Sequence, residues 1–185
     1  MIITGKSFKE EIQNGNIIIS PFDEQFINPN SYDLHLGRYL YRLDDEIVDP
    51  LKPHKWTKYD LTERDIIIKP NKLYLGHTVE IAGSTVYVSK IEGKSTLGRL
   101  GLSIHMTAGY GDIGFVGSWT LEITTVKPFV LRYGMPICQI EFSVVKGLQY
   151  NLYNGRYNGK IEVGLPEPRT DWVFLKANEW RQNNK

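Results

Sequence analysis

The sequence has little cysteine and lacks the common metal-ligand motifs. Cys138 is the one cysteine among 185 residues, so no disulfide can form within the chain. This composition is typical of a reducing compartment, and we expect a cytoplasmic protein. None of the four histidines begins an H-x-E motif, and P-C-x-x-C does not occur. The zinc site of the nucleobase deaminases is therefore excluded, and we expect no metal held by protein ligands.

The sequence also lacks a long apolar run and an excess of one charge. No stretch approaches the roughly 18 apolar residues of a membrane span, and the first ten residues do not have the pattern of a signal peptide. We therefore expect no membrane association. The net charge is +1, which does not indicate an electrostatic nucleic-acid binder. The length suits one globular domain, which we expect over residues 1–175, followed by a C-terminal tail, 176–185.

Strand signals dominate the sequence from residue 65 onward. From residue 65 onward, short runs rich in Ile, Val, Thr and aromatic residues recur roughly every ten residues between Gly, Pro or Asn-Lys. This spacing is typical of a β-sandwich, a jelly roll or a small barrel. Residues 7–14 are predicted to form a helix that opens on a capping box of Ser7 and Glu10. The polar segment 44–64 contains two prolines and is predicted to be a long loop.

The segment "GKSTLGR" places two cations close to two hydroxyl groups. Lys94, Ser95, Thr96 and Arg99 could together bind an anion, because Lys and Arg supply charge and the hydroxyls supply donors. The segment is not a P-loop, since Val88 stands where that motif requires glycine. An ordinary solvated turn between strands remains the alternative from spacing alone.

The segment "AGYGDIGF" contains the first of two carboxylates of interest. Three glycines surround Asp112, which permits positive φ and a close approach of the backbone to a ligand. The alternative is a hairpin turn in which Asp112 is an ordinary turn residue.

The second carboxylate is Glu122 in "SWTLEITTV". Alternation places Trp119, Leu121 and Ile123 on one face of a strand and leaves Glu122 on the other. If the Trp119 face is buried, Glu122 faces solvent, a second layer or a pocket, where it could transfer protons. The alternative is a solvated strand residue.

The segment "YNGRYNGK" interleaves tyrosines with Arg156 and Lys160. It could stack on a base and bind phosphate, or it could be a polar tail. His105, in "SIHMT", is more typical of a strand residue with its hydrogen bonds satisfied than of a metal ligand.

Taken together, these segments resemble one family, the dCTP deaminases of the trimeric dUTPase superfamily. "GKSTLGRLGL" is similar to the family's G-R-S-S-x-x-R-x-G-L, and "TAGYGDIGFVGSWTLE" to its T-A-G-[FWY]-x-D-x-G-F-x-G-x-x-T-L-E. "GMPICQIEF" is similar to the G-x-x-I-x-Q strand. The resemblance extends from the N-terminus to "YNGRYNG", except for residues 44–64.

The resemblance implies a mainly β, dUTPase-like distorted β-barrel or jelly roll with a short N-terminal helix. It also implies a homotrimer with active sites at subunit interfaces and a zinc-independent hydrolase acting on dCTP or dUTP. Glu122 matches the general acid/base that activates water against C4 of cytosine. Ser95 and Arg99 match residues that position this water and orient the glutamate, and Asp112 matches the aspartate that prepares water for attack on the α-phosphorus.

Further residues are implied to bind the nucleotide. Lys94 and Thr96 match phosphate contacts, the Ala108 carbonyl matches a contact to the base, and Phe115 matches the aromatic ring under the deoxyribose. The other implied binding residues are Tyr110, Gln139, Tyr153, Arg156, Tyr157 and Lys160. Mg²⁺ is implied as an ion carried by the triphosphate, with no protein ligands.

The chain combines Glu122 with Ala108, Gly109 and Tyr110, which match the T-A-G-[FWY] part of the family motif. This combination most resembles the dUMP-forming branch, which takes dCTP to dUMP, ammonia and pyrophosphate. The sequence departs from the family pattern at Lys94, Gly111, Ile113 and Lys160. Four alternatives therefore stay open: a deaminase that releases dUTP, a dUTPase alone, an enzyme for a modified cytosine, and a catalytically silent nucleotide-binding regulator.

Overall fold

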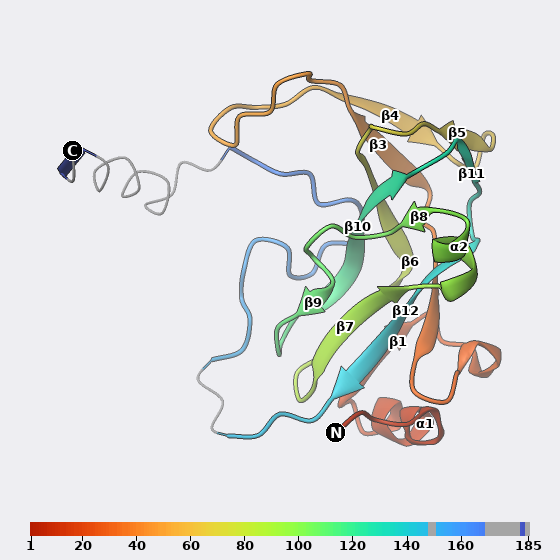
Figure 1. Cartoon of the computed structure of the whole chain (residues 1–185). Helices are drawn as coiled ribbons and strands as arrows, with labels where there is room; N and C mark the ends of the chain where they lie inside the picture. Colours follow the sequence, from red (N-terminus) through yellow and green to blue (C-terminus); the bar gives the residue numbers. More distant parts are fainter. Residues whose placement is uncertain (148–150, 169–181, 184–185) are drawn as a thin grey trace.

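The computed structural model describes residues 1–147, 151–168 and 182–183. Its helices are α1 (Gly5–Gln13), η1 (Glu24–Phe26, a 3-10 turn) and α2 (Ser95–Arg99). Its strands are β1 (Ile17–Ser20), β2 (Tyr32–His35), β3 (Tyr39–Leu43), β4 (Trp56–Asp60), β5 (Ile66–Ile68), β6 (Tyr74–Ser84), β7 (Val88–Gly93), β8 (Leu102–Ser103), β9 (Tyr110–Gly111), β10 (Val116–Thr125), β11 (Phe129–Leu131) and β12 (Pro136–Ser143). Figure 1 shows the predicted short helix near the N-terminus and a body made of strands.

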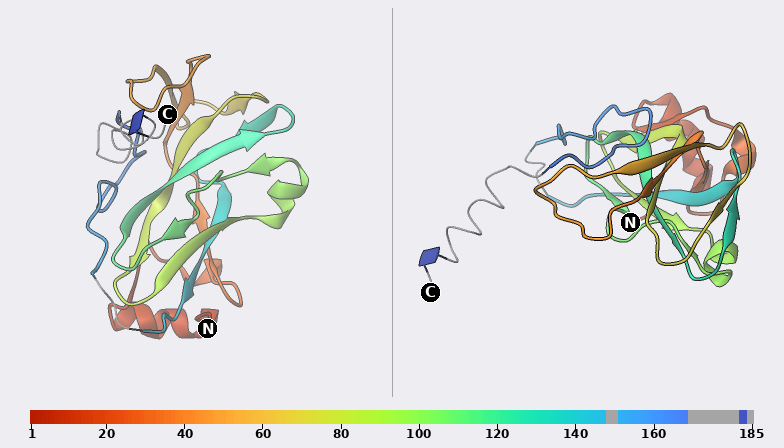
Figure 2. Two further views of the ribbon diagram at one scale, coloured as in Figure 1. Left: turned by 60° about the vertical axis from the view of Figure 1, so that its left-hand side comes forward. Right: turned by 90° about the horizontal axis from the view of Figure 1, so that it is seen from above.

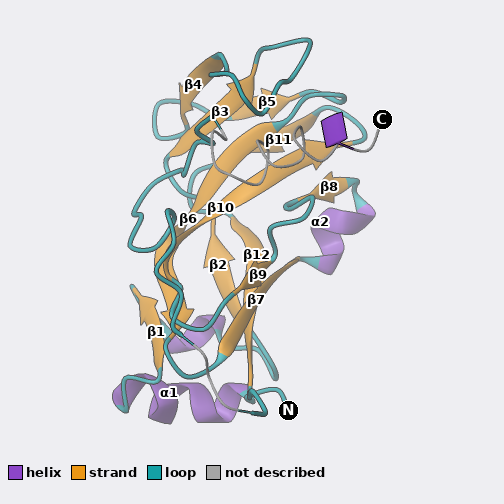
Figure 3. Cartoon of the chain, turned by 90° about the vertical axis from the view of Figure 1, so that its left-hand side faces the viewer, coloured by secondary structure: helices purple, strands orange, loops and turns teal. Residues whose placement is uncertain are grey.

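Two antiparallel sheets form the body of the protein. The larger sheet has the order β4-β3-β6-β10-β8, with β1 also paired to β6, and the smaller has the order β2-β12-β7-β9. A further pair joins β5 and β11. Fully buried residues of both sheets belong to one hydrophobic core, among them Leu40 and Leu121 of the larger sheet and Leu34 and Ile140 of the smaller. The sheets therefore pack face to face, with β6 and β10 as the long central strands (Figure 3).

Strand β10 shows the alternation predicted from its sequence. Trp119, Leu121 and Ile123 are buried, while Thr120 and Glu122 on the other face are half-buried. Strand β6 pairs with β10 along most of its length, with a register shift between Ser118 and Thr120, and the register places Glu122 opposite Leu75.

The predicted start of the first helix is wrong. Helix α1 begins at Gly5 after Thr4, and no capping box forms at Ser7. The Gly5 N–H donates to the Pro29 carbonyl at 2.8 Å, and a Cβ at Gly5 would lie 2.1 Å from the Asn28 carbonyl oxygen. This tertiary contact extends the helix beyond the start that the local sequence indicated.

The segment predicted as a long loop, 44–64, contains strand β4. Residues Trp56 to Asp60 pair with β3 from Leu43 to Tyr39, so the irregular part is shorter than expected. Of the short runs expected as strands from residue 65 onward, the one that contains Leu102 is reduced to the two residues of β8. The segment "GKSTLGR", for which a turn was the alternative to an anion site, contains the short helix α2. Nearly all of the expected C-terminal tail, 176–185, lies outside the described residues.

Within the described part of the chain, no helix is long and apolar enough to cross a membrane.

Candidate functional site

A pocket of about 320 Å³ joins the central strands to the C-terminal segment. Five predicted site residues line it from the central block: Ala108, Tyr110, Asp112, Phe115 and Glu122. Three more line it from the C-terminal segment: Tyr153, Tyr157 and Lys160. The volume falls in the usual range of small-molecule sites, and the two carboxylates of the sequence analysis therefore belong to one pocket.

The loop before β9 holds the carboxylate of Glu122. Its Oε2 accepts the backbone N–H groups of Met106 at 2.7 Å, Thr107 at 2.9 Å and, more weakly, Ala108 at 3.4 Å. All three N–H groups donate to Oε2, and none of them donates to Oε1. Successive N–H groups fix the orientation of the carboxylate, as a general acid/base requires.

Asp112 stands at the first position of a tight turn that links β9 to β10. The Phe115 N–H donates to the Asp112 carbonyl at 3.0 Å, and Gly114 has φ of +98°. This is the pattern of a type II turn, which needs glycine at its third position. The backbone also passes close to the core here, since a Cβ at Gly111 would lie 2.5 Å from the ring of Trp119.

Aromatic rings form one wall of the pocket. Phe115 meets Trp119 edge to face at 5.0 Å between ring centroids and meets Tyr153 at 5.9 Å. Trp119 is fixed in turn, because its indole N–H donates to the Ala82 carbonyl at 3.1 Å. Such a wall offers apolar faces to a sugar or a base.

The C-terminal segment covers the pocket by pairing with a free edge of β10. On that edge β8 pairs only with Thr124 and Thr125. Nearer the start of the strand, the Ser118 N–H donates to the Lys160 carbonyl at 2.7 Å, and the Gly159 N–H donates to the Val116 carbonyl at 2.9 Å. Figure 2 shows this blue segment running along the body of the protein.

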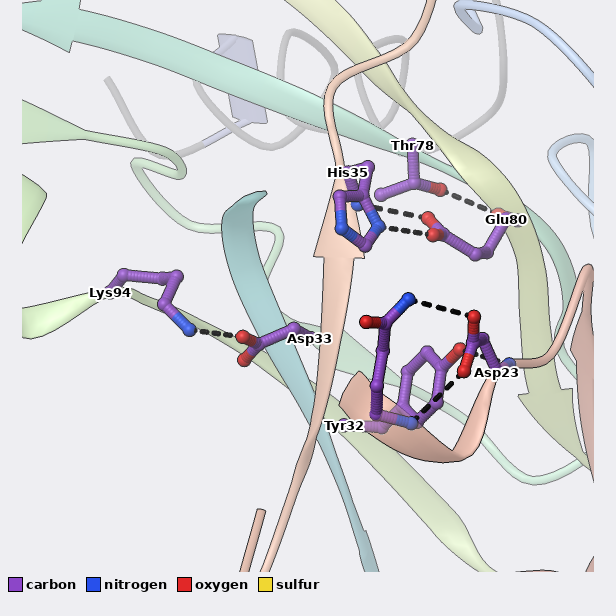
Figure 4. Close-up of polar contacts among 8 residues, drawn as sticks. Asp23, Tyr32, Asp33, His35, Thr78, Glu80 and Lys94 are labelled. Atoms are coloured by element: carbon purple, nitrogen blue, oxygen red, sulfur yellow. Dashed lines mark hydrogen bonds and ion pairs between the residues drawn. The ribbon is translucent and has the colours of Figure 1, made fainter. Parts of the chain in front are cut away.

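The predicted phosphate cluster does not line this pocket. Ser95, Thr96 and Arg99 lie on α2 and are exposed. Lys94 is paired with Asp33 at 2.5 Å (Figure 4).

Two other predicted residues also lie elsewhere. Gln139, on β12, accepts the Ser31 hydroxyl at 2.9 Å and lines a separate polar cavity of about 420 Å³. Arg156 pairs with Glu167 at 3.7 Å and is not part of the pocket lining.

Sequence reasoning missed several residues of the pocket, including Trp56, Leu73, Thr120 and Pro166. Thr120 could have been found, because alternation places it on the Glu122 face. Trp56 gave no such signal, because its segment was interpreted as a loop. The backbone N–H groups of Met106 and Thr107 were also missed, since a side-chain pattern does not reveal them.

The architecture defines the class of the protein. It is a mainly β, dUTPase-like fold, as the sequence predicted, and it superposes with a TM-score of 0.63 on the crystal structure of 2′-deoxycytidine 5′-triphosphate deaminase from Agrobacterium tumefaciens. That match covers 80% of this chain at 21% identity, and the chain spans about half (49%) of the length of the crystallised one.

Sequence comparison then identifies the family. Residues 2–145 match the dCTP deaminase-like family model, and the chain belongs to this family. It is 45% identical over 157 residues to a protein from Clostridium acetobutylicum named dCTP deaminase, dUMP-forming, a match that covers 85% of this chain and 90% of that protein. A protein of the same name from Clostridium beijerinckii is 46% identical over 158 residues, with the same two coverages.

Proposed function

We propose that the chain hydrolyses dCTP to dUMP, ammonia and pyrophosphate in a cytoplasmic homotrimer. The relatives named dUMP-forming support this assignment. The observation that carries it is the placement of Glu122 and Asp112 in one pocket that aromatic rings also line. A substrate that loses both an amino group and pyrophosphate consumes two waters at different atoms, and two carboxylates in one pocket can each activate one of them.

Glu122 would perform the deamination. Its carboxylate takes a proton from water as the water oxygen bonds to C4 of cytosine and the C4–N3 double bond opens, and it delivers that proton to N3. It then moves the proton of the new C4 hydroxyl to the exocyclic nitrogen, the bond from C4 to that nitrogen breaks as the C4–O double bond forms, and ammonia leaves. The N–H groups of Met106 and Thr107 keep the carboxylate in place through both transfers.

Asp112 would perform the phosphate step. It accepts a proton from a second water whose oxygen attacks the α-phosphorus, and the bond to the bridging oxygen breaks to release pyrophosphate. Two waters are consumed for each dCTP. Phe115 and Tyr153 would pack against the deoxyribose between these two centres, and Tyr157 and Lys160 would complete the wall.

Mg²⁺ would enter as part of the substrate. Among the described residues, no three His, Cys, Asp or Glu side chains come together as a set of metal ligands. Phosphate oxygens and water suit this ion better than a protein cage, and they would supply its ligands.

Ser95 and Arg99 would serve the pocket of a neighbouring subunit. They are exposed on α2, and neither lines the pocket that contains Glu122. Lys94 and Thr96 would contribute phosphate contacts from the same segment. Mixed trimers test this arrangement: Glu122→Gln chains and Arg99→Ala chains, each inactive alone, should regain activity when refolded together. No recovery in trimers shown to be mixed would reject the shared site.

A product assay tests the function itself. Purified protein is incubated with Mg²⁺ and either dCTP or dUTP, and the nucleotides are separated by ion-exchange chromatography. We expect dUMP from dCTP with little free dUTP. Accumulated dUTP would show that Gly111 and Ile113, the departures beside Asp112, have disabled the phosphate step. Turnover of dUTP alone would mark a dUTPase, and no turnover of either would favour a silent nucleotide-binding protein.

A further inference from the structure

The pocket continues past Glu122 across the larger sheet. Glu122 lies opposite Leu75 on β6, and Leu75 lies opposite Tyr41 on β3. One step further along, the Leu43 N–H donates to the Leu73 carbonyl at 3.0 Å, and Leu43 lies opposite Trp56 on β4. Side chains two residues apart on a strand share a face, so Glu122, Leu75, Leu73 and Trp56 face the same side of the sheet.

The residues of this face that line the pocket beyond Glu122 are apolar, and they form one lobe of it. Leu73, Leu75 and Trp56 line it from the sheet, and Pro166 lines it from the C-terminal segment. Neighbouring strands lie about 4.8 Å apart, so β4 is roughly 10 Å from β6, and the lobe extends well beyond the reach of the Glu122 carboxylate. Gly164 fixes the cover, because its N–H donates to the Thr120 hydroxyl at 2.9 Å.

The chemistry of the pyrimidine ring indicates what this lobe takes. C4 must lie at Glu122, and the atoms on either side of C4 are N3, which is polar, and C5, which carries hydrogen. C6 faces the sugar. An apolar lobe next to Glu122 therefore suits the C5 edge, and a group attached to C5 would extend into it.

We infer that the lobe ending at Trp56 is a subsite for a substituent on C5 of the cytosine ring. The substrates then include deoxycytidine triphosphates with an apolar group at C5. This inference rests on the proposed function and specifies its substrate range. The group at C5 takes no part in the reaction, so the products are the 5-substituted dUMP, ammonia and pyrophosphate.

The test compares kcat/KM for dCTP, 5-methyl-dCTP and 5-propynyl-dCTP. We expect the wild-type protein to turn over all three, with 5-propynyl-dCTP within about tenfold of dCTP. Leu73→Trp would fill the lobe and should lower the ratio of 5-propynyl-dCTP to dCTP by at least about tenfold, as a steric clash in a pocket does. Trp56→Ala removes the end wall and should lower the same ratio by loss of contact. Tyr133→Ala is the matched control, because Tyr133 is an exposed aromatic residue that does not line the pocket.

The outcomes separate the two claims. Turnover of dCTP with none of 5-propynyl-dCTP by the wild type would overturn the subsite alone. Equal effects of Leu73→Trp on all three nucleotides, in protein with a native circular dichroism spectrum, would also overturn it. If Leu73→Trp does not fold, an unchanged ratio in Trp56→Ala has the same meaning. No turnover of any nucleotide would overturn the proposed function itself.

Discussion

Replacing Glu122 by glutamine should stop deamination while the protein stays folded. Glutamine keeps the length of the side chain and one carbonyl oxygen, so it can still accept the N–H groups of Met106 and Thr107. It cannot accept a proton from water. General acid/base groups contribute roughly 10² to 10⁴ in rate, and we expect kcat for ammonia release to fall by that factor.

The effect of this substitution on stability should be small. Hydrogen bonds to a charged group contribute about 1.5–3 kcal/mol, against about 1 for neutral pairs. The loop that donates these N–H groups is exposed at Met106, where water can form hydrogen bonds with them instead. We therefore expect a loss of about 1 kcal/mol, which lowers Tm by roughly 2–4 °C in a chain of this size.

The assay follows ammonia release and pyrophosphate release separately, with dCTP and dUTP as substrates. Glu122→Gln should lose ammonia release but still release pyrophosphate from dUTP. Asp112→Asn should still release ammonia from dCTP but lose the release of pyrophosphate. Deamination at the wild-type rate by Glu122→Gln would refute the assignment. A fall in Tm of more than about 10 °C would refute the claim that the side chain contributes little to stability.

Three further predictions concern the scaffold. Burial lowers the pKa of His77 below 6.5 despite its hydrogen bond to the Thr78 carbonyl. As the pH falls, His77 therefore becomes protonated at a higher pH in the unfolded chain than in the folded one. The contribution of His77 to the free energy of unfolding should be constant above about pH 6.5. Below that pH it should fall by at most about 1.4 kcal/mol per pH unit, and a pKa of His77 at or above 6.5 in an NMR titration would contradict this. Leu121→Ala should cost about 2–5 kcal/mol in urea unfolding, since Leu121 is fully buried, and a loss below 1 kcal/mol would show that the sheets do not pack there. Gly111→Ala should displace the backbone beside Asp112, because its Cβ would contact Trp119, and unchanged pyrophosphate release would show that the pocket tolerates the shift.

The sequence predicted the strands that alternate cleanly and the side chains that they orient. Strand β10 is the best case, because burial of Trp119 and Leu121 is enough to place Glu122 on the opposite face. Strand β4 was missed because its burial does not alternate, and it is stabilised as a strand by its pairing with β3. The start of α1 was missed for a similar reason, since a carbonyl distant in sequence sets it.

The composition of the pocket was only partly predictable. The resemblance to known deaminases named residues of both the central block and the C-terminal segment, and eight of them line one pocket. Ser95 and Arg99 belong to the same motif but lie on a separate, exposed helix. A linear motif does not distinguish residues that meet within one chain from residues that would meet across an interface.

The edge pairing of β10 explains why the C-terminal segment lies over the pocket. Strand β6 pairs with one edge of β10, and β8 pairs with the far end of the other. Among the residues that the structure describes, no strand therefore pairs with the backbone groups near Val116 and Ser118 on that second edge. Lys160 and Gly159 satisfy them, and the Asn158 side chain accepts the Val116 N–H at 3.0 Å. Since unpaired edge groups are costly when buried, this pairing favours the position of the C-terminal segment over the pocket. The strand that carries Glu122 therefore also fixes the cover of the pocket, so a change in the register of β10 would disturb both at once.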